Sequence, residues 1–184
     1  WESTASYYRL INQGVKKALG GFHSAKICMF SVDFDEIERL QQADRWPAMA
    51  EILAKAAQRV EAGGAEFLLI CTNTMHKLAA ELQSQIKIPI LNIIDVTAEH
   101  IKSLGFKTVG LLGTRFTMEE DFYKDRLIQK HGLKVLIPGT ESIQKIHHII
   151  VEELSVGEIR ASSKDTYWEI MNHLKKQGAE GIIL

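Results

Sequence analysis

Gly64-Ala65-Glu66-Phe67-Leu68-Leu69-Ile70 is a glycine turn followed by a short apolar run, and it recurs 114 residues later as Gly178-Ala179-Glu180-Gly181-Ile182-Ile183-Leu184. Each copy follows an amphipathic pattern that predicts a helix ending at a glycine. Because a helix, a turn and an apolar run recur together, an internal duplication is favoured over a chance match. We therefore expect two similar halves, over residues 1–96 and 97–184.

Short apolar runs alternate with helical patterns along the whole chain. The clearest helical pattern, Trp46–Ala62, places apolar residues at i, i+3 and i+4 and stops at a glycine pair. Nearly continuous apolar runs joined through helices are typical of parallel strands covered on both faces, so the predicted fold class is α/β. The predicted strands are 26–32, 67–71, 90–94, 108–112, 134–137 and 180–184, and the other predicted helices are 75–86, 96–104, 118–130 and 167–176.

The composition is typical of a soluble globular protein. The 184 residues include 22 Lys+Arg and 23 Asp+Glu, for a formal net charge of -1, and 46% of them belong to the hydrophobic class. This balance argues against a protein that tracks nucleic-acid phosphates, and the longest uncharged stretch, 67–76, is roughly half of the ~20 apolar residues needed to span a bilayer. Because the only cysteines are Cys28 and Cys71, we expect no disulfide framework and a cytoplasmic location.

The most informative polar stretch is Cys71-Thr72-Asn73-Thr74-Met75-His76, which follows the apolar run 67–70. In open α/β sheets, ligands bind at the carboxyl ends of the strands. Small polar side chains and free backbone N–H groups at the start of a helix suit a carboxylate ligand. The alternative is that Thr72 or Asn73 only caps the following helix, as threonine and asparagine often do.

The 71–76 stretch resembles the Cys-Asn-Thr-Ala-His element of the aspartate/glutamate racemase superfamily, and further elements match the family in order along the whole chain. These are His23-Ser24-Ala25, Ser31-Val32-Asp33-Phe34, Leu111-Leu112-Gly113-Thr114-Arg115-Phe116-Thr117-Met118 and Glu152-Glu153-Leu154. Together they look most like the bacterial branch that acts on L-aspartate and L-glutamate. The resemblance implies two pseudo-symmetric Rossmann-like halves with parallel sheets, and an active site in the cleft between them.

The resemblance also implies a cofactor-independent racemase in which one side chain removes the Cα proton and a partner on the opposite face returns one. In most members both groups are cysteines. Here Thr72 precedes Asn73-Thr74, and Cys71 lies one position earlier. Because successive side chains of a strand point to opposite faces, we expect Thr72 in the catalytic position and Cys71 turned away as a buried thiol. A local shift that presents Cys71 is the alternative.

The partner of Thr72 is expected outside the 184 residues. The repeat offset places it at position 186, just beyond Leu184, and the Gly-Cys-Thr-Glu element of the family implies the same place. The first-half counterpart of Leu104-Gly105-Phe106-Lys107-Thr108-Val109-Gly110-Leu111-Leu112-Gly113 would fall before Trp1, where the resemblance implies a first strand and a Gly-Gly-Met-Ser turn. We therefore expect no racemase activity from residues 1–184 alone.

The resemblance implies that Asn73, Thr74 and Thr117 hold the substrate carboxylates, with Thr114 nearby. Thr117 follows the predicted strand 108–112 and matches a family position whose hydroxyl and N–H contact a substrate carboxylate. The alternative for this second turn is again helix capping, because threonine is a frequent cap.

Gln41 is a candidate contact to the side-chain carboxylate of the substrate. A solvated position on a helix surface is the more frequent explanation of such a residue, and many relatives use an arginine in this region. Arg39 or Arg45 could take that role here.

The leading hypothesis is racemisation of a dicarboxylic amino acid, aspartate or glutamate, by two-base α-proton transfer in a homodimer. A lyase or decarboxylase of the same superfamily, which needs only one productive base, and a non-catalytic carboxylate-binding protein are the alternatives. The seven histidines show no metal-ligand spacing, and no phosphate loop or Gly-x-Gly-x-x-Gly element occurs. We expect no cofactor, no metal, and neither a nucleic acid nor a membrane as partner.

Overall fold

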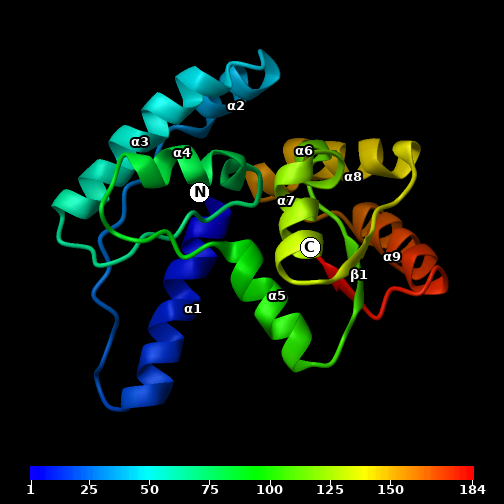
Figure 1. Cartoon of the computed structure of the whole chain (residues 1–184), viewed down its shortest axis with the longest axis horizontal. Coiled ribbons are helices and arrows are strands. Elements are labelled where there is room, and N and C mark those ends of the chain that lie inside the picture. Colours follow the sequence, from blue (N-terminus) through cyan, green and yellow to red (C-terminus); the bar gives the residue numbers. More distant parts are fainter. The chain divides into compact units, whose positions relative to one another are not determined.

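The computed structural model describes residues 1–184, and the chain divides into two units, Trp1–Leu91 (unit 1) and Asn92–Leu184 (unit 2) (Figure 1). Helices and a parallel sheet combine in the chain, which confirms the predicted α/β class. None of the helices combines the length and the apolar character needed to cross a membrane.

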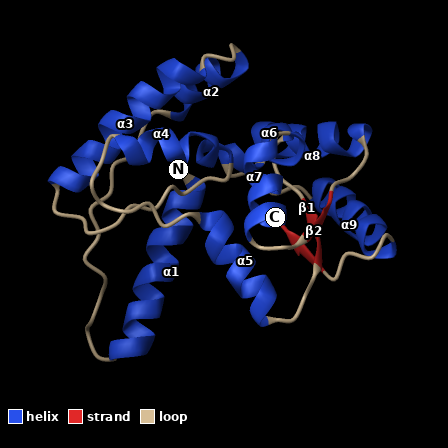
Figure 2. Ribbon diagram, in the orientation of Figure 1, coloured by secondary structure: helices blue, strands red, loops and turns tan.

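A three-stranded parallel sheet forms the centre of unit 2 (Figure 2). Its strands are β1 (Thr108–Leu111), β2 (Lys134–Leu136) and β3 (Gly181–Ile183), in the order β2-β1-β3. In the register, Val109 lies opposite Val135 on one side and Gly181 on the other. The three strands confirm the predictions for 108–112, 134–137 and 180–184, each somewhat shorter than predicted.

Helices pack against both faces of this sheet. Successive residues of β1 point to opposite faces, so each layer of helices contacts a different set of β1 residues. Val109 and Leu111 belong to a core formed with α5 and the segment after β1. Gly110 faces α9, where a Cβ atom would lie 2.9 Å from Leu174 Cδ1, so a glycine allows the helix to approach closely. The helical elements of unit 2 are α5 (Ile93–Ser103), α6 (Arg115–Glu119), α7 (Asp121–Asp125), the π-helical η2 (Arg126–Lys130), α8 (Thr140–Glu152), the 3-10 turn η3 (Leu154–Val156) and α9 (Ala161–Lys176).

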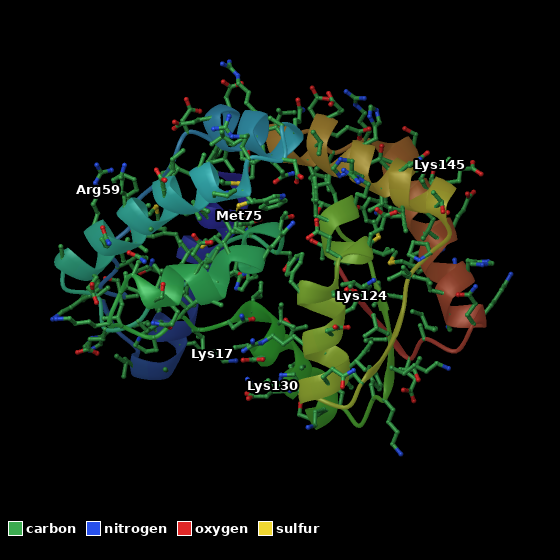
Figure 3. All side chains as sticks on the ribbon, turned by 45° about the horizontal axis from the view of Figure 1, so that its top comes forward. Lys17, Arg59, Met75, Lys124, Lys130 and Lys145 are labelled. Carbon is green, nitrogen blue, oxygen red and sulfur yellow. The ribbon has the colours of Figure 1, made fainter.

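Unit 1 is mainly helical, with the core between its helices. Met49 and Ala50 of α3 pack against Ile37 of α2 and against Met75 and Leu78. Figure 3 labels Met75 inside this unit and Arg59 on the outer side of α3. The elements of unit 1 are α1 (Glu2–Leu19), α2 (Phe34–Gln42), α3 (Trp46–Ala62), the 3-10 turn η1 (Thr74–Leu78) and α4 (Ala79–Ser84). The prediction of a helix over Trp46–Ala62 is confirmed.

The strand predictions for unit 1 are wrong. Residues 26–32 form no backbone hydrogen bond, and within 67–71 only Leu68 pairs, in an isolated parallel bridge to Ile90. The predicted strand 90–94 gives way to α5, which starts at Ile93 with Asn92 as its cap. An extended apolar segment becomes a strand only when a neighbour accepts its hydrogen bonds, and residues 26–32 have no such neighbour.

Four predicted helices differ from the observed ones. The predicted helix 118–130 is wrong as a single element: Glu120, at φ -79° and ψ 157°, is extended and separates α6 from α7. The predicted helix 75–86 is instead a 3-10 turn followed by the short α4. The helices predicted at 96–104 and 167–176 exist but begin earlier, at Ile93 and Ala161.

An ionic cluster centred on Asp95 ties α5 to the helical segment after β1. Arg126 donates to both carboxylate oxygens of Asp95, at 2.7 Å from Nε and 2.7 Å from Nη2. Lys130 Nζ and His131 Nε2 lie 2.8 Å from the same carboxylate, and Figure 3 labels Lys130 on this segment. The Arg126 guanidinium, with Lys130 and His131, holds the pKa of Asp95 well below its usual range despite partial burial.

We expect Asp95→Asn to lower the free energy of unfolding by about 1–3 kcal/mol, because it removes charge-assisted hydrogen bonds. Since the pKa of Asp95 is lower in the folded state, this contribution is present above the unfolded pKa of about 4 and is lost as the pH falls below it. Chemical denaturation at neutral and acidic pH measures it. Asp125→Asn, on an exposed carboxylate of α7, is the matched control and leaves stability nearly unchanged. Equal effects of the two substitutions on the free energy of unfolding would contradict a stabilising role for the cluster around Asp95.

Candidate functional site

The turn 71–76 follows the extended residues 67–70 and runs into the 3-10 turn η1, which begins at Thr74, and its residues differ sharply in exposure. Thr72 is exposed, whereas Thr74, Met75 and His76 are buried. His76 Nδ1 lies 2.8 Å from the carbonyl oxygen of Thr72. Because a carbonyl oxygen only accepts hydrogen bonds, Nδ1 carries the hydrogen and donates it. The buried imidazole therefore holds the backbone of the turn and leaves the Thr72 side chain on the surface.

Cys71 lies against α1 and is half-buried, rather than fully buried as predicted. The Ser3 hydroxyl donates to the Cys71 carbonyl oxygen at 2.7 Å. Burial raises the pKa of the Cys71 thiol, and a hydrogen bond with Thr4 offsets part of that rise. Since an unperturbed thiol already has a pKa near 8.5, Cys71 is largely protonated at neutral pH. It is therefore a poor base in this environment.

Asn73 carries a buried acceptor without a partner. Its side-chain Oδ1 is shielded from solvent and accepts no hydrogen bond within the chain. Buried polar groups are nearly always paired, because an unpaired one loses its hydration without replacement. A donor brought by a ligand would satisfy this oxygen, so Asn73 is the residue of the turn best suited to hold one.

Gln41 is buried on α2, with 6% of its surface exposed, so its interpretation as a solvated surface residue is wrong. Its helix packs on α3 and η1 through the core of unit 1, which turns this position inward. The two arginines that could have replaced it are both exposed, and Arg39 forms a salt bridge of 2.6 Å to Asp35. Of Gln41, Arg39 and Arg45, only Gln41 is buried.

The second candidate turn brings Thr114 and Thr117 together in unit 2. Their hydroxyl oxygens lie 3.2 Å apart, and the Thr117 N–H donates to Thr114 Oγ1 at 3.3 Å. Thr114 therefore caps α6, which confirms the capping alternative for this residue. Thr117 is fully buried, and a Cβ atom on Gly113 would lie 2.9 Å from its Cγ2, so this glycine leaves the space that Thr117 needs.

His147 on α8 supports the same turn. Its Nδ1 accepts a hydrogen bond of 3.3 Å from the Arg115 backbone N–H, and its ring packs edge-on against Phe116. Burial and the nearby Arg115 charge lower the pKa of His147, which favours the neutral ring that this contact requires. No sequence pattern indicates the pairing, because the two residues are 32 positions apart.

The predicted residues thus form two separate groups, one in each unit. Thr72, Asn73 and Thr74 lie in one turn of unit 1, and Thr114 and Thr117 lie in one turn of unit 2. No group of three or more His, Cys, Asp or Glu side chains is arranged to hold a metal ion.

Comparison with protein families gives a match that covers residues 1–184. The family model described as Asp/Glu/Hydantoin racemase matches residues 1–184. A curated relative, the broad specificity amino-acid racemase RacX of Bacillus subtilis (strain 168), is 27% identical over 127 residues, which are 68% of this chain. The match spans 55% of the length of that relative.

Solved structures show the same fold. A Yersinia pestis protein described as a candidate Asp/Glu racemase is 48% identical with a TM-score of 0.89, over 99% of this chain and 79% of its own. An aspartate racemase homologue from Pyrococcus horikoshii OT3 is 32% identical with a TM-score of 0.80, over 100% of this chain and 79% of its own. The Picrophilus torridus aspartate racemase is 18% identical with a TM-score of 0.70, over 99% of this chain and 74% of its own, and shows a shared fold alone.

Proposed function

Because the chain belongs to the Asp/Glu/hydantoin racemase family, we propose that it racemises amino acids, with aspartate and glutamate as substrates. The observation that carries the proposal is the match of the family model to every residue from 1 to 184. The names of the relatives support it: one is an amino-acid racemase and two refer to aspartate or Asp/Glu racemases.

In the proposed reaction, a base removes the Cα proton from one face of the amino acid and a second group returns a proton to the other face. No cofactor takes part. Thr72 acts as the acid/base of unit 1. Asn73, through its amide N–H groups, holds the carboxylates together with Thr74 and Thr117, which leaves Asn73 Oδ1 as an acceptor for another substrate group. Gln41 contacts the side-chain carboxylate. These roles are our proposal from the family pattern and the positions of the residues.

Two features of the turn 71–76 support Thr72 over Cys71. The Thr72 side chain is exposed and accessible to a substrate, whereas Cys71 lies against α1 with a raised thiol pKa. A threonine hydroxyl is itself a weak acid, so the bound substrate and its surroundings have to activate it. We therefore propose an asymmetric site that handles the two enantiomers at unequal rates.

The unpartnered Oδ1 of Asn73 supports an amino-acid ligand in particular. An α-ammonium group offers three N–H donors, and one of them would satisfy this buried acceptor. The same substrate offers carboxylates to the hydroxyls of neighbouring threonines. A ligand with both groups thus satisfies the turn better than a simple dicarboxylate does.

Deuterium exchange tests the proposal. The full-length protein is incubated with L-aspartate or L-glutamate in D2O without added cofactor, and NMR follows the loss of the α-hydrogen signal. We expect exchange of one or both substrates, together with the appearance of the D-enantiomer by chiral chromatography.

Absence of α-hydrogen exchange for both amino acids would overturn the proposed function. Release of carbon dioxide from a malonate-type substrate without such exchange would instead indicate a decarboxylase. Binding of aspartate in a calorimeter without any turnover would indicate a carboxylate-binding protein.

A further inference from the structure

His147 lies on a helix that is packed firmly around the second candidate turn, residues 113–117. Ile146 of α8 is fully buried in one core with Leu112 and Met118, the residues that directly precede and follow this turn. Figure 1 shows α8 beside α6 in unit 2, and the two helices are in contact. Because a close-packed core holds α8 against both ends of the turn, a side chain of α8 that reaches the turn has a fixed position.

The start of α6 is held at two backbone N–H groups, and one of these bonds depends on His147. The first four N–H groups of a helix have no partner within the helix. Thr114 Oγ1 accepts from the Thr117 N–H at 3.3 Å, and this cap is local to the turn. His147 Nδ1 accepts from the Arg115 N–H, also at 3.3 Å. The second bond connects the start of α6 to a different element.

Ring contacts add to this backbone contact. The Phe116 ring packs edge-on against the His147 imidazole, with the centroids 6.1 Å apart and the planes at 82°. Arg115 Cζ lies 4.7 Å from the centroid of the Phe116 ring, and Arg115 Nη1 lies 3.9 Å from Glu119 Oε2. The imidazole therefore contacts the turn through both a backbone group and a side chain, and it fixes the orientation of residues 115–116.

The position of the Thr117 hydroxyl depends on this arrangement. Thr117 is fully buried, and its hydroxyl oxygen lies 3.2 Å from that of Thr114. A Cβ atom on Gly113 would lie 2.9 Å from Thr117 Cγ2, so the side chain has little room to turn. Because the side chain cannot readjust, a shift at the start of α6 would displace the hydroxyl with the backbone.

We propose that His147 is a positioning residue for the proposed racemase reaction: its neutral imidazole holds the Arg115 N–H and thereby keeps the Thr117 hydroxyl where it binds a substrate carboxylate. This inference rests on the proposed function and on the role of Thr117 in it. In this role His147 touches neither the substrate nor the transferred proton. Its loss therefore weakens substrate binding, which raises KM, and leaves kcat nearly unchanged.

The protonation state of the ring gives this role a pH signature. Nδ1 accepts a hydrogen bond only while it carries no hydrogen, whereas an imidazolium ring directs an N–H at the Arg115 N–H. Burial and Arg115 of α6 lower the pKa of His147, Glu119 of α6 opposes them, and His148 of α8 lowers it further. The contact is therefore present at neutral pH and is lost as the pH falls below the ordinary histidine pKa of about 6.5, and KM should rise over that range.

Enzyme kinetics test the role. The α-hydrogen exchange of L-aspartate gives kcat and KM for the full-length protein, for His147→Leu, which has no acceptor, and for His147→Asn, whose Oδ1 is an acceptor. We expect His147→Leu to raise KM about 3–10-fold at neutral pH, the usual weight of one neutral hydrogen bond, with kcat within about twofold. His147→Asn restores most of the loss and removes the rise of KM in acid. His148→Asn, on the exposed neighbour, is the matched control and changes neither constant.

A measurement on the substrate-free protein tests the contact itself. NMR follows the Arg115 amide and the His147 ring between about pH 8 and about pH 5. We expect both signals to titrate with one midpoint, and the Arg115 amide to lose protection from hydrogen exchange as the ring is protonated. In His147→Asn the amide should show no such midpoint.

Three results would overturn the positioning role. One is an Arg115 amide that does not follow the titration of the His147 ring. Another is an equal rise in KM for His148→Asn. The third is normal exchange by the wild-type protein with an unchanged KM in His147→Leu, which would leave the proposed function intact.

Failure of the proposed function itself is a separate result. If the wild-type protein exchanges the α-hydrogen of neither amino acid, the proposed function fails, and calorimetry with L-aspartate then decides the role of His147. A dissociation constant about 3–10-fold higher for His147→Leu supports the positioning role. Equal dissociation constants, or no binding to either protein, overturn it.

Discussion

Replacement of Thr72 by alanine is expected to reduce the α-hydrogen exchange of L-aspartate by about 10²–10⁴-fold, the usual contribution of a positioned acid/base. The side chain is exposed, so its removal should leave the fold intact. Thr72→Ser retains the hydroxyl and should keep most of the activity. Exchange in D2O by NMR measures the rates, and the melting temperature verifies that the variants are folded.

Cys71→Ala is the matched control for Thr72→Ala, because it removes the neighbouring reactive group. We expect it to retain most of the exchange activity, since burial raises the thiol pKa and the residue lies against α1. The opposite pattern, with an active Thr72→Ala and an inactive Cys71→Ala, would show that Cys71 is the base. In that case the alternation of side chains at the end of the extended segment would be shifted by one residue.

The apolar pattern of the sequence predicts the strands of unit 2 because all three partners lie within the chain. The same pattern over 26–32 and 67–71 fails to predict the structure of unit 1. The reason is physical: apolar alternation reports burial and extension, whereas a strand also requires a neighbour with matching hydrogen bonds. Figure 2 shows the consequence, with named strands in unit 2 alone.

The break in the helical segment after β1 could not be predicted from the sequence either. No glycine or proline marks Glu120, yet this residue is extended and ends α6. Lys124 Nζ donates to the Glu119 carbonyl oxygen at 2.6 Å, which satisfies a group that a continuous helix would have used. Interactions of this kind depend on side chains several positions away and leave no periodic signal.

Some features of the candidate site follow from residue types, and others depend on packing. Capping by Thr114 was an explicit alternative because threonine at a helix start often caps. The burial of Gln41 depends on how α2 packs on α3 and η1, which its local sequence does not indicate. The unpaired Oδ1 of Asn73 likewise depends on the surroundings of the turn.

Asn73→Ala is expected to raise the KM for L-aspartate by about 10–100-fold, because a hydrogen bond to a charged group contributes about 1.5–3 kcal/mol. Without substrate, the same change removes a buried acceptor that has no partner. The free energy of unfolding of the substrate-free protein should therefore change by less than about 1 kcal/mol, or even increase, because the desolvation cost of that oxygen is relieved. Initial rates and chemical denaturation measure the two quantities.

Asn92→Ala provides the matched control, because this asparagine uses the same side-chain oxygen for a structural purpose. Asn92 Oδ1 accepts from the Ile94 N–H at 2.9 Å and caps α5. Its loss should cost about 0.5–2 kcal/mol of stability with little change in KM. A structural role for Asn73 would produce the same result as Asn92→Ala, namely lower stability at unchanged KM. A substrate-binding role for Asn73 therefore requires that Asn73→Ala raises KM without lowering stability, whereas Asn92→Ala lowers stability without raising KM.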